Sequence, residues 1–239
     1  MMNNLKEEDS MKKQCIMILI LMTTVFYMAT FSIGVEKVFA QDKSPGAATI
    51  KLPAPKYSSD TSVEKALLER RSVRSYKAEP LTIPEIAQVL WAAQGITEPK
   101  KGLRTAPSPR GMYLIEVYLI AGNVTNLPAG IYKYGPQGHE LIKIAEGNIK
   151  DDLFKVAGQA QIKSAPVALL IAGKSAEASG NPQWMYLEAG HVSQNVYLQA
   201  ESLKLGAVTM AGFKAEDVKK ALKLPANEQP IYLMCIGKK

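Results

Sequence analysis

The uninterrupted apolar segment 166–172, PVALLIA, constrains the fold of this chain more than any other stretch. A run of this length without polar residues is typical of a strand that is buried on both faces. The segment 182–205 carries Met185, Ala189 and Val192 at helical spacing, which predicts a long, mostly buried helix. We therefore expect a buried strand and a long central helix in the core.

Two shorter helices are predicted from capping boxes. Residues 61–64 (TSVE) and 82–85 (TIPE) each place a threonine three positions before a glutamate. This pattern marks a helix N-terminus because both side chains bond to backbone N–H groups that have no partner within the helix. We expect one helix to run from Thr61 to about Arg70 and a second to run from Thr82 to Gly95.

The remaining elements follow from apolar patterns and turn residues. Strands are predicted over 115–121, 130–134, 139–144, 206–210 and 229–236, short helices over 148–156 and 214–222, and loops over 97–104, 105–111 and 158–163. Residues 60–239 contain no repeat and no internal linker. One α+β domain is therefore expected over this range.

The N-terminal 40 residues have the pattern of a secretory signal peptide. Lys12 and Lys13 precede an apolar stretch that ends at Ala40, which predicts cleavage after Ala40 and export to the periplasm or the extracellular space. A start at Met11 is an alternative that would leave residues 1–10 upstream of the translated chain. The alternative is a membrane anchor through residues 15–35, which are numerous enough to span a bilayer. Residues 41–59 are proline-rich and predict an extended lead-in.

The ionisable residues exclude several classes of enzyme. The chain has two histidines and two cysteines and lacks the motifs G-x-S-x-G, H-E-x-x-H and G-x-x-x-x-G-K-[ST]. We expect His139 to be solvated, His191 to be a core imidazole and Cys235 to be buried and inert, with no metal site. A bound cofactor is then the expected source of any chemistry.

The net charge of the chain indicates anionic ligands. It is +7, and residues 1–40 carry four lysines and four acidic residues, so their removal leaves the charge at +7. Three arginines and two serines lie within residues 70–75, RRSVRS. Guanidinium and hydroxyl donors together suit a phosphate monoester. The alternative is a solvated basic helix end, which the helix dipole also favours.

Four segments in register resemble the nitroreductase superfamily. They are residues 69–76 (ERRSVRSY), 104–108 (RTAPS), 188–195 (EAGHVSQN) and 205–213 (LGAVTMAGF). The TAPS sequence, followed by residues 113–117, is most similar to the SagB-type branch of azoline or thiazole/oxazole-forming dehydrogenases. The resemblance covers about residues 60–237.

The resemblance implies a mixed, mainly antiparallel sheet flanked by helices, in a homodimer that holds FMN at the subunit interface. It assigns Arg70, Ser72 and Arg74 to the FMN phosphate and pyrimidine edge, with Arg71 at a neighbouring position. Pro107 and Ser108 match a loop supplied by the partner subunit. Met210, Ala211 and Gly212 match the turn whose backbone amide points at flavin N5, and Lys238 or Lys239 could contact the phosphate. Residues 109–111 (PRG) depart from the amide side chain common in the family.

The function expected from this resemblance is that of an exported FMN-dependent oxidoreductase. It would pass hydride between a donor such as NAD(P)H and a small organic acceptor, without nucleic acid as a partner. Two alternatives remain open, a SagB-type azoline dehydrogenase that acts on peptide heterocycles and a non-enzymatic flavin-binding protein.

Overall fold

The computed structural model describes residues 48–178 and 180–239. Residues Ala47–Lys239 form one compact unit. The predicted signal peptide and the first part of the predicted lead-in, residues 1–47, lie outside the described residues. The described part of the lead-in contains a short strand, β1 (Thr49–Lys51), which pairs with β6 (Glu140–Glu146).

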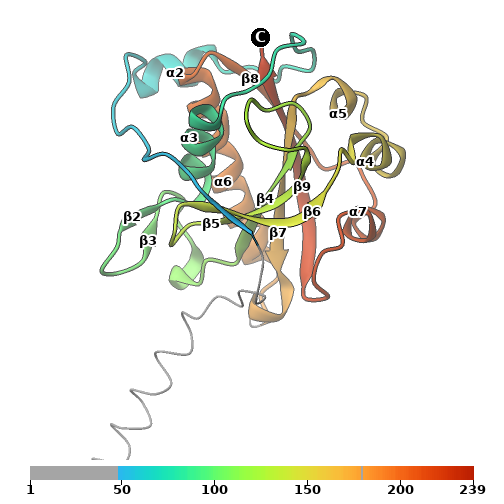
Figure 1. Ribbon diagram of the computed structural model, residues 1–239. Coiled ribbons are helices and arrows are strands. Elements are labelled where there is room, and N and C mark those ends of the chain that lie inside the picture. The colour runs from blue at the N-terminus through green and yellow to red at the C-terminus, as the bar shows by residue number, and fades with distance from the viewer. Residues whose placement is uncertain (1–47, 179) are drawn as a thin grey trace, which may run out of the picture. The chain divides into compact units, whose positions relative to one another are not determined.

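The sheet has seven strands in the order β1-β6-β5-β4-β7-β9-β8 (Figure 1). Every pairing between neighbouring strands of this sheet is antiparallel, and a parallel bridge from Ser72 to Ala207 adds a mixed contact at the β8 edge. The predicted α+β fold with a mainly antiparallel sheet is thus confirmed. The strands not yet given are β4 (Ile115–Ala121), β5 (Gly130–Gly135), β7 (Val167–Lys174), β8 (Leu205–Met210) and β9 (Glu228–Lys238).

Helices cover both faces of the sheet (Figure 1). One core lies under α3 (Ile83–Gln94) and α6 (Gln183–Ser202), and the other lies under α4 (Lys150–Ala157), α5 (Gln161–Ser164) and α7 (Ala215–Ala221). Leu169 of β7 points into the first core and Leu170 into the second. The prediction that this segment is a strand buried on both faces is confirmed.

The predicted long helix is α6, and its packing residues are the ones expected from helical spacing. Met185, Ala189, Val192 and Val196 are all buried. The opposite face of α6 remains exposed, with Tyr186 among its exposed residues. The helix ends at Ser202, and Lys204 then takes a left-handed conformation with φ 59°.

The two predicted capping boxes have different outcomes. Thr82 and Glu85 form both bonds of a capping box at the start of α3, which ends before Gly95 as predicted. The helix α2 (Val63–Glu69) is capped by Ser62, whose hydroxyl accepts from the Lys65 amide at 3.2 Å, and not by Thr61. The prediction was wrong by one residue because two adjacent hydroxyl residues compete for the same role.

Three local predictions are corrected by the structure. The predicted loop 97–104 contains the hairpin of β2 (Ile96–Glu98) and β3 (Leu103–Arg104), whose strands are too short to show an alternating pattern. The segment 158–163 was predicted as a loop but includes the start of α5. The helix predicted from Asn148 begins at Lys150, and the Asn148 side chain accepts from the Lys150 amide at 3.2 Å.

Two short 3-10 turns complete the described elements, η1 (Pro109–Gly111) and η2 (Ser175–Ala178). Among the described residues, no helix has the length and apolar character needed to cross a membrane. Within the same ranges, no group of His, Cys, Asp and Glu side chains is arranged to hold a metal ion.

Candidate functional site

The segment that follows α2 lies against the edge strand β8. Arg70 is the C-cap residue that follows α2, and its amide donates to the Ala66 carbonyl at 3.0 Å. The Val73 amide then donates to the Ala207 carbonyl at 2.9 Å. A side chain at Gly206 would meet the Val73 side chain at 2.6 Å, so glycine permits this close approach. The local fold therefore fixes the arginine-rich segment on β8.

Arg70 and Ser72 meet Tyr197 of α6. The Arg70 guanidinium carbon lies 5.1 Å from the centroid of the Tyr197 ring, within the range of a cation–π contact. The Ser72 hydroxyl lies 3.4 Å from the Tyr197 hydroxyl, and the Thr209 amide donates to the same phenol oxygen at 2.7 Å. Burial raises the pKa of Tyr197, but its hydrogen bonding with Ser72 and Thr209 outweighs burial, and the pKa is lowered overall.

The three arginines of the motif have different surroundings. The Arg71 guanidinium donates to the carbonyls of Leu68 and Arg70, at 2.9 and 2.8 Å, so it has the contacts expected of a basic helix end. Arg74 is exposed, and its guanidinium lies 3.5 Å from the Ser72 carbonyl. Arg71 thus fits the interpretation of the motif as a basic helix end, whereas Arg70 differs from it by packing on Tyr197.

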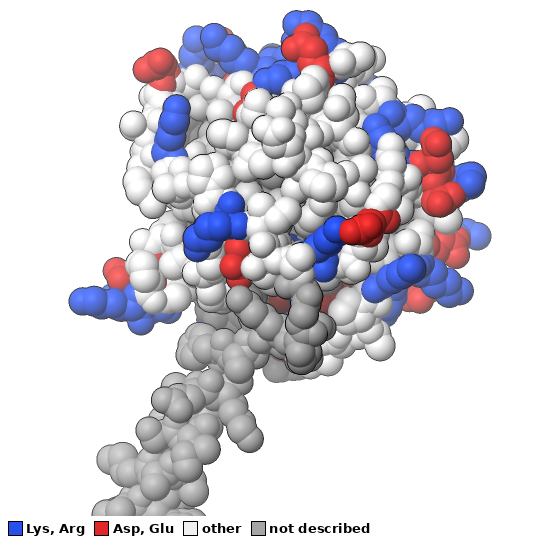
Figure 2. Space-filling model, in the orientation of Figure 1, with Lys and Arg blue, Asp and Glu red and all other residues white. Residues whose placement is uncertain are grey.

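Basic side chains gather over this end of the domain. Figure 2 shows Lys and Arg over α2, β8 and the C-terminus as Figure 1 draws them. The exposed basic residues of these segments include Arg71, Arg74, Lys77 and Lys204. A positive surface of this kind attracts anions before they are bound.

The turn after β8 is open to solvent. Met210 is buried, whereas Ala211 and Gly212 are exposed. The Gln159 side-chain amide donates to the Gly212 carbonyl at 3.2 Å, and the nearest atom to an added Cβ at Gly212 would be 3.7 Å away. The backbone of this turn is therefore accessible to a flat ligand.

Thr209 joins the turn to the arginine-rich segment. Its backbone amide bonds to Tyr197, and its hydroxyl lies 3.1 Å from the Ser193 hydroxyl of α6. Met210 follows directly along β8. One residue thus connects the Arg70 and Ser72 group with the predicted N5 turn.

The Pro107 and Ser108 loop is held on the first half of α6. The Ser108 hydroxyl donates to the Glu188 carboxylate at 2.6 Å, and His191 Nδ1 lies 3.0 Å from the Pro107 carbonyl. The Asn195 side-chain amide donates to the Thr105 carbonyl at 3.2 Å. His191 is exposed, so the prediction of a core imidazole was wrong, because this face of α6 supports the loop and does not enter the core.

Glu188 is the buried centre of this support. Its side chain is fully buried, and its carboxylate also accepts from the Leu114 amide at 3.0 Å and from the Gln94 side chain at 3.1 Å. The Tyr113 amide donates to the Ser108 hydroxyl at 2.8 Å. The loop conformation is therefore fixed by polar contacts to a buried carboxylate and to the adjoining face of α6.

Within one chain the loop and the arginine-rich segment occupy different parts of α6. His191 and Tyr197 are six residues apart, which corresponds to about 9 Å along a helix. The structure thus brings Arg70, Ser72 and the turn after Met210 together, and it places Pro107 and Ser108 separately. Arg110, in the departure from the family pattern, has φ 54° and lies over the Trp184 ring at 5.3 Å.

The C-terminal lysines are both paired with carboxylates. Lys238 forms an ion pair with Glu85 at the start of α3, and Lys239 forms one with Glu201 of α6. Glu201 lies one turn of α6 after Tyr197. Of the two lysines, Lys239 is therefore the one whose partner adjoins the Arg70 and Ser72 group.

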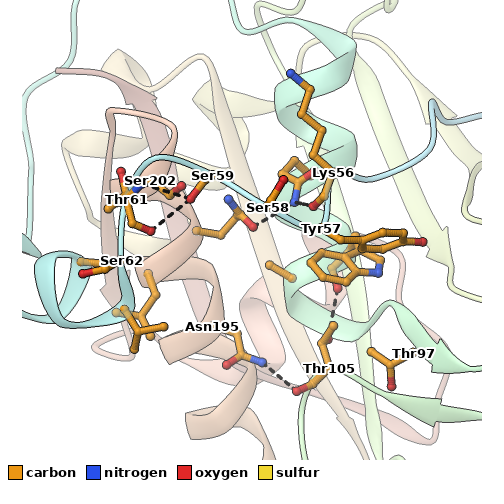
Figure 3. A pocket seen from close by; sticks show the side chains of 17 residues that line it. Lys56, Tyr57, Ser58, Ser59, Thr61, Ser62, Thr97, Thr105, Asn195 and Ser202 are labelled. Carbon is orange, nitrogen blue, oxygen red and sulfur yellow. Dashed lines mark hydrogen bonds between the residues drawn. The ribbon is translucent and has the colours of Figure 1, made fainter.

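A cavity of about 630 Å³ lies between the segment 56–63, α3 and α6 (Figure 3). The Tyr57 and Trp91 rings meet edge to face at 5.5 Å beside it. None of the residues predicted for the cofactor site lines this cavity. It adjoins the loop through Thr105, which bonds to Asn195 as Figure 3 shows.

His139, in the β5–β6 turn, was predicted to be solvated, and this prediction was wrong. His139 is half-buried, with Nδ1 at 2.8 Å from the Tyr134 hydroxyl and Nε2 at 2.9 Å from the Pro53 carbonyl. Burial lowers the pKa of this imidazole. Cys235 is buried as predicted, and burial raises the pKa of its thiol to about 12.

Comparison with known proteins decides the family. Residues 67–238 match the model of the nitroreductase family. The chain belongs to the nitroreductase family. A protein of Methanocaldococcus jannaschii described as a nitroreductase is 36% identical over 183 residues, which cover 74% of this chain and 91% of that relative. The predicted family and the predicted class of enzyme, an oxidoreductase, are confirmed.

Solved structures of other nitroreductase-fold proteins agree. A nitroreductase from Ralstonia eutropha has a TM-score of 0.71 and 28% identity, and the match covers 83% of this chain and 96% of that one. Two further structures share the fold at lower identity. The Escherichia coli microcin synthetase McbBCD complex, solved with truncated pro-MccB17 bound, has a TM-score of 0.62 and 22% identity, with 86% and 80% covered. The NADPH:FMN oxidoreductase of Vibrio harveyi has a TM-score of 0.53 and 22% identity, with 74% and 68% covered.

Several residues of this candidate site were not predicted from the sequence. They are Tyr197, Thr209, Glu188 and Gln159. Glu188 lies inside a segment that resembles the family, but its position at the start of a buried helix gives no sign of its contact with Ser108. Tyr197 and Thr209 follow apolar residues in a helix and a strand, where they would be expected to pack.

Proposed function

We propose that this nitroreductase is an exported oxidoreductase with FMN as its cofactor, which passes hydride from a donor such as NAD(P)H to a small organic acceptor. The observation that carries the proposal is the junction of Arg70, Ser72 and the exposed turn at Ala211 and Gly212. A guanidinium and a hydroxyl lie at one end of this junction, and an accessible backbone lies at the other. This is the arrangement that a phosphate joined to a flat ring requires.

The residues of this chain have distinct roles in the proposal. Arg70, Ser72 and Arg74 would hold the phosphate and the pyrimidine edge, since each presents hydrogen-bond donors. A backbone N–H of the Ala211 and Gly212 turn would face flavin N5 and stabilise negative charge there. The flavin, when bound, supplies the capacity to accept and return hydride. Lys238 would need to leave Glu85 to reach the phosphate.

We also propose a homodimer, in which Pro107 and Ser108 complete the site of the other copy. Two features support it. The loop is fixed on α6 at a distance from the Arg70 group of its own chain. Tyr186 and Leu187 on α6 are large apolar side chains with 48% and 57% exposure, and exposed apolar groups of this size favour an interface.

Export is proposed from the sequence of residues 1–40. The test is the intact mass of the protein recovered from the periplasm or the medium, which should begin at Gln41. Recovery of the full-length chain in the membrane fraction would instead support an anchor through residues 15–35.

The deciding experiment is the visible absorbance of the protein purified from residue 41 onward. We expect stoichiometric bound flavin, released as FMN on denaturation and bleached by NADH or NADPH without oxygen. A colourless protein that also fails to bind added FMN would refute the proposal. Stoichiometric FMN that neither nicotinamide reduces would indicate another donor or a non-enzymatic flavin-binding protein.

A second candidate is a SagB-type azoline dehydrogenase. It is favoured by the sequence TAPS at 105–108 and by the shared fold of the microcin synthetase complex. Anaerobic mixing of the flavin-loaded protein with a thiazoline peptide should then reduce the flavin. An unchanged flavin spectrum would exclude this substrate.

A further inference from the structure

Tyr197 lies where three separate parts of the chain meet. Its ring is under the Arg70 guanidinium, and its hydroxyl contacts both Ser72 and the Thr209 backbone. These groups come from the end of α2, from the segment after it and from β8. The phenol is therefore in contact with two of the proposed phosphate-binding residues, Arg70 and Ser72.

The direction of one hydrogen bond is fixed. A backbone N–H can only donate, so the Tyr197 oxygen accepts from Thr209 at 2.7 Å. The phenol hydrogen is then available to the Ser72 oxygen. A serine hydroxyl that accepts from Tyr197 turns its own hydrogen away from the phenol and toward solvent, where an anion would lie.

Hydrogen bonds in series polarise one another. The series from Thr209 through Tyr197 to Ser72 ends in a donor, which suits phosphate oxygens. The Ser72 and Tyr197 hydroxyls are 3.4 Å apart, which is long for such a pair. The quantity to measure is consequently the coupling free energy between Ser72 and Tyr197 in FMN binding.

Arg70 is supported by the same residue. A guanidinium over an aromatic face keeps its N–H edges free for other partners. Arg70 is half-buried at the end of α2, so its position depends on the ring beneath it. Loss of the ring would free the guanidinium from this position.

We propose that Tyr197 is a positioning residue of the phosphate subsite, which orients the Ser72 hydroxyl as a donor and holds the Arg70 guanidinium over its ring. The inference rests on the proposed function, because the ligand it serves is the phosphate monoester of FMN. Its specific consequence is selectivity for FMN over riboflavin, which has the same ring system without the phosphate.

The test is titration of wild type, Tyr197→Phe and Tyr197→Leu with FMN and with riboflavin. Tyr197→Phe should weaken FMN binding roughly three- to tenfold, as expected for one hydrogen bond, and leave riboflavin binding unchanged. Tyr197→Leu should weaken FMN binding further, because it also removes the cation–π contact. Riboflavin binding is the control for general damage to the protein, because loss of a merely structural residue would weaken the binding of both ligands.

Two further variants sharpen the result. Ser72→Ala combined with Tyr197→Phe should bind FMN no worse than Ser72→Ala alone, because both changes break the same series of bonds. Tyr132→Phe on β5 removes a phenol hydroxyl that bonds to the Pro128 carbonyl and should leave FMN binding at the wild-type level. Additive effects of Ser72→Ala and Tyr197→Phe, or equal losses for FMN and riboflavin, would overturn the inference.

Failure of the proposed function would be recognised separately. Wild-type protein that binds neither flavin would refute the proposed function. The same variants would then be titrated with inorganic phosphate, and weaker phosphate binding by Tyr197→Phe would still support the role of Tyr197. Equal phosphate affinity of the variant and the wild type would overturn it.

Discussion

Adjacent arginines in this chain have different partners. Arg70 packs on Tyr197, whereas Arg71 donates to the carbonyls at the end of α2. The string RRS could not separate these roles because both side chains are long and both lie at a helix end. Only the ring beneath Arg70 distinguishes its surroundings from those of Arg71.

Arg70→Ala is expected to weaken FMN binding by about 1.5–3 kcal/mol, the magnitude of a hydrogen bond to a charged group. Isothermal titration of the flavin-free protein measures the change. Lys65→Ala, which removes the same charge from the exposed face of α2, is the control and should change the affinity far less. Unchanged FMN affinity in Arg70→Ala would place the phosphate elsewhere.

Glu188 allows a prediction about stability. Its buried carboxylate accepts from Ser108, Leu114 and Gln94. Glu188→Gln replaces one accepting oxygen with an NH₂ group, which cannot accept from these donors. The free energy of unfolding in urea should fall by about 1–3 kcal/mol. Asp152→Asn, on the exposed face of α4, should change it by less than about 0.5 kcal/mol. A Glu188→Gln variant as stable as the wild type would show that the loop does not depend on this carboxylate.

Glu85, at the start of α3, takes part in the capping box of this helix and also contacts the last strand, β9. Glu85 bonds to the Thr82 amide and hydroxyl, both at 2.9 Å, and pairs with Lys238 of β9. Burial raises the pKa of Glu85, but the bonds from Lys238 and Thr82 outweigh burial and hold the pKa below its usual value of 4.5. The folded state therefore binds the proton less readily than the unfolded state.

This pKa predicts how stability depends on pH. A lowered folded pKa contributes stability above the unfolded pKa, and that stability is lost as the pH falls through the folded pKa. The difference in free energy of unfolding between wild type and Glu85→Gln should be constant from pH 7 to about 6 and shrink below about pH 5. When both proteins also carry Lys238→Ala, the difference that Glu85→Gln makes to the free energy of unfolding should be smaller and less dependent on pH. A difference that stays constant down to pH 3 would contradict the assignment.

Elements with strong local signals were predicted well. The capping box of α3 and the apolar run of β7 each identify their element because the determining contacts are local or the burial is complete. The hairpin of β2 and β3 was missed, since strands of three and two residues carry no period. The cap of α2 was displaced because Thr61 and Ser62 are chemically equivalent in sequence.

The candidate site was predictable only where its residues form a motif. The arginine-rich segment, the Pro107 loop and the turn at Gly212 each stand out locally. Tyr197 and Glu188 do not, because their roles come from contacts across 125 and 80 positions of the chain. Such partners are set by the packing of α6 on the sheet, and no short pattern records that packing.

The proposed dimer predicts the effect of a charge on α6. Leu187→Glu would bury a carboxylate against apolar surface in the dimer, which is costly, and should shift the protein from dimer to monomer in light scattering. Flavin binding should weaken along with it, because the loop comes from the partner. Ile144→Glu on β6, at an exposed apolar site with 42% exposure, is the matched control and should remain dimeric. A dimeric, flavin-binding Leu187→Glu variant would exclude this face of α6 from the interface.

The separation of the Arg70 group from the Pro107 loop along α6 has a genetic consequence. In the proposed dimer each site combines the arginines of one copy with the loop of the other. An Arg70→Ala chain mixed with a chain altered at Ser108 would then form hybrids in which one site is doubly altered and the other is intact. Random pairing makes half of the dimers hybrids, so the mixture should recover about a quarter of the wild-type sites. In the proposed dimer, two alleles that are each impaired alone would therefore complement each other.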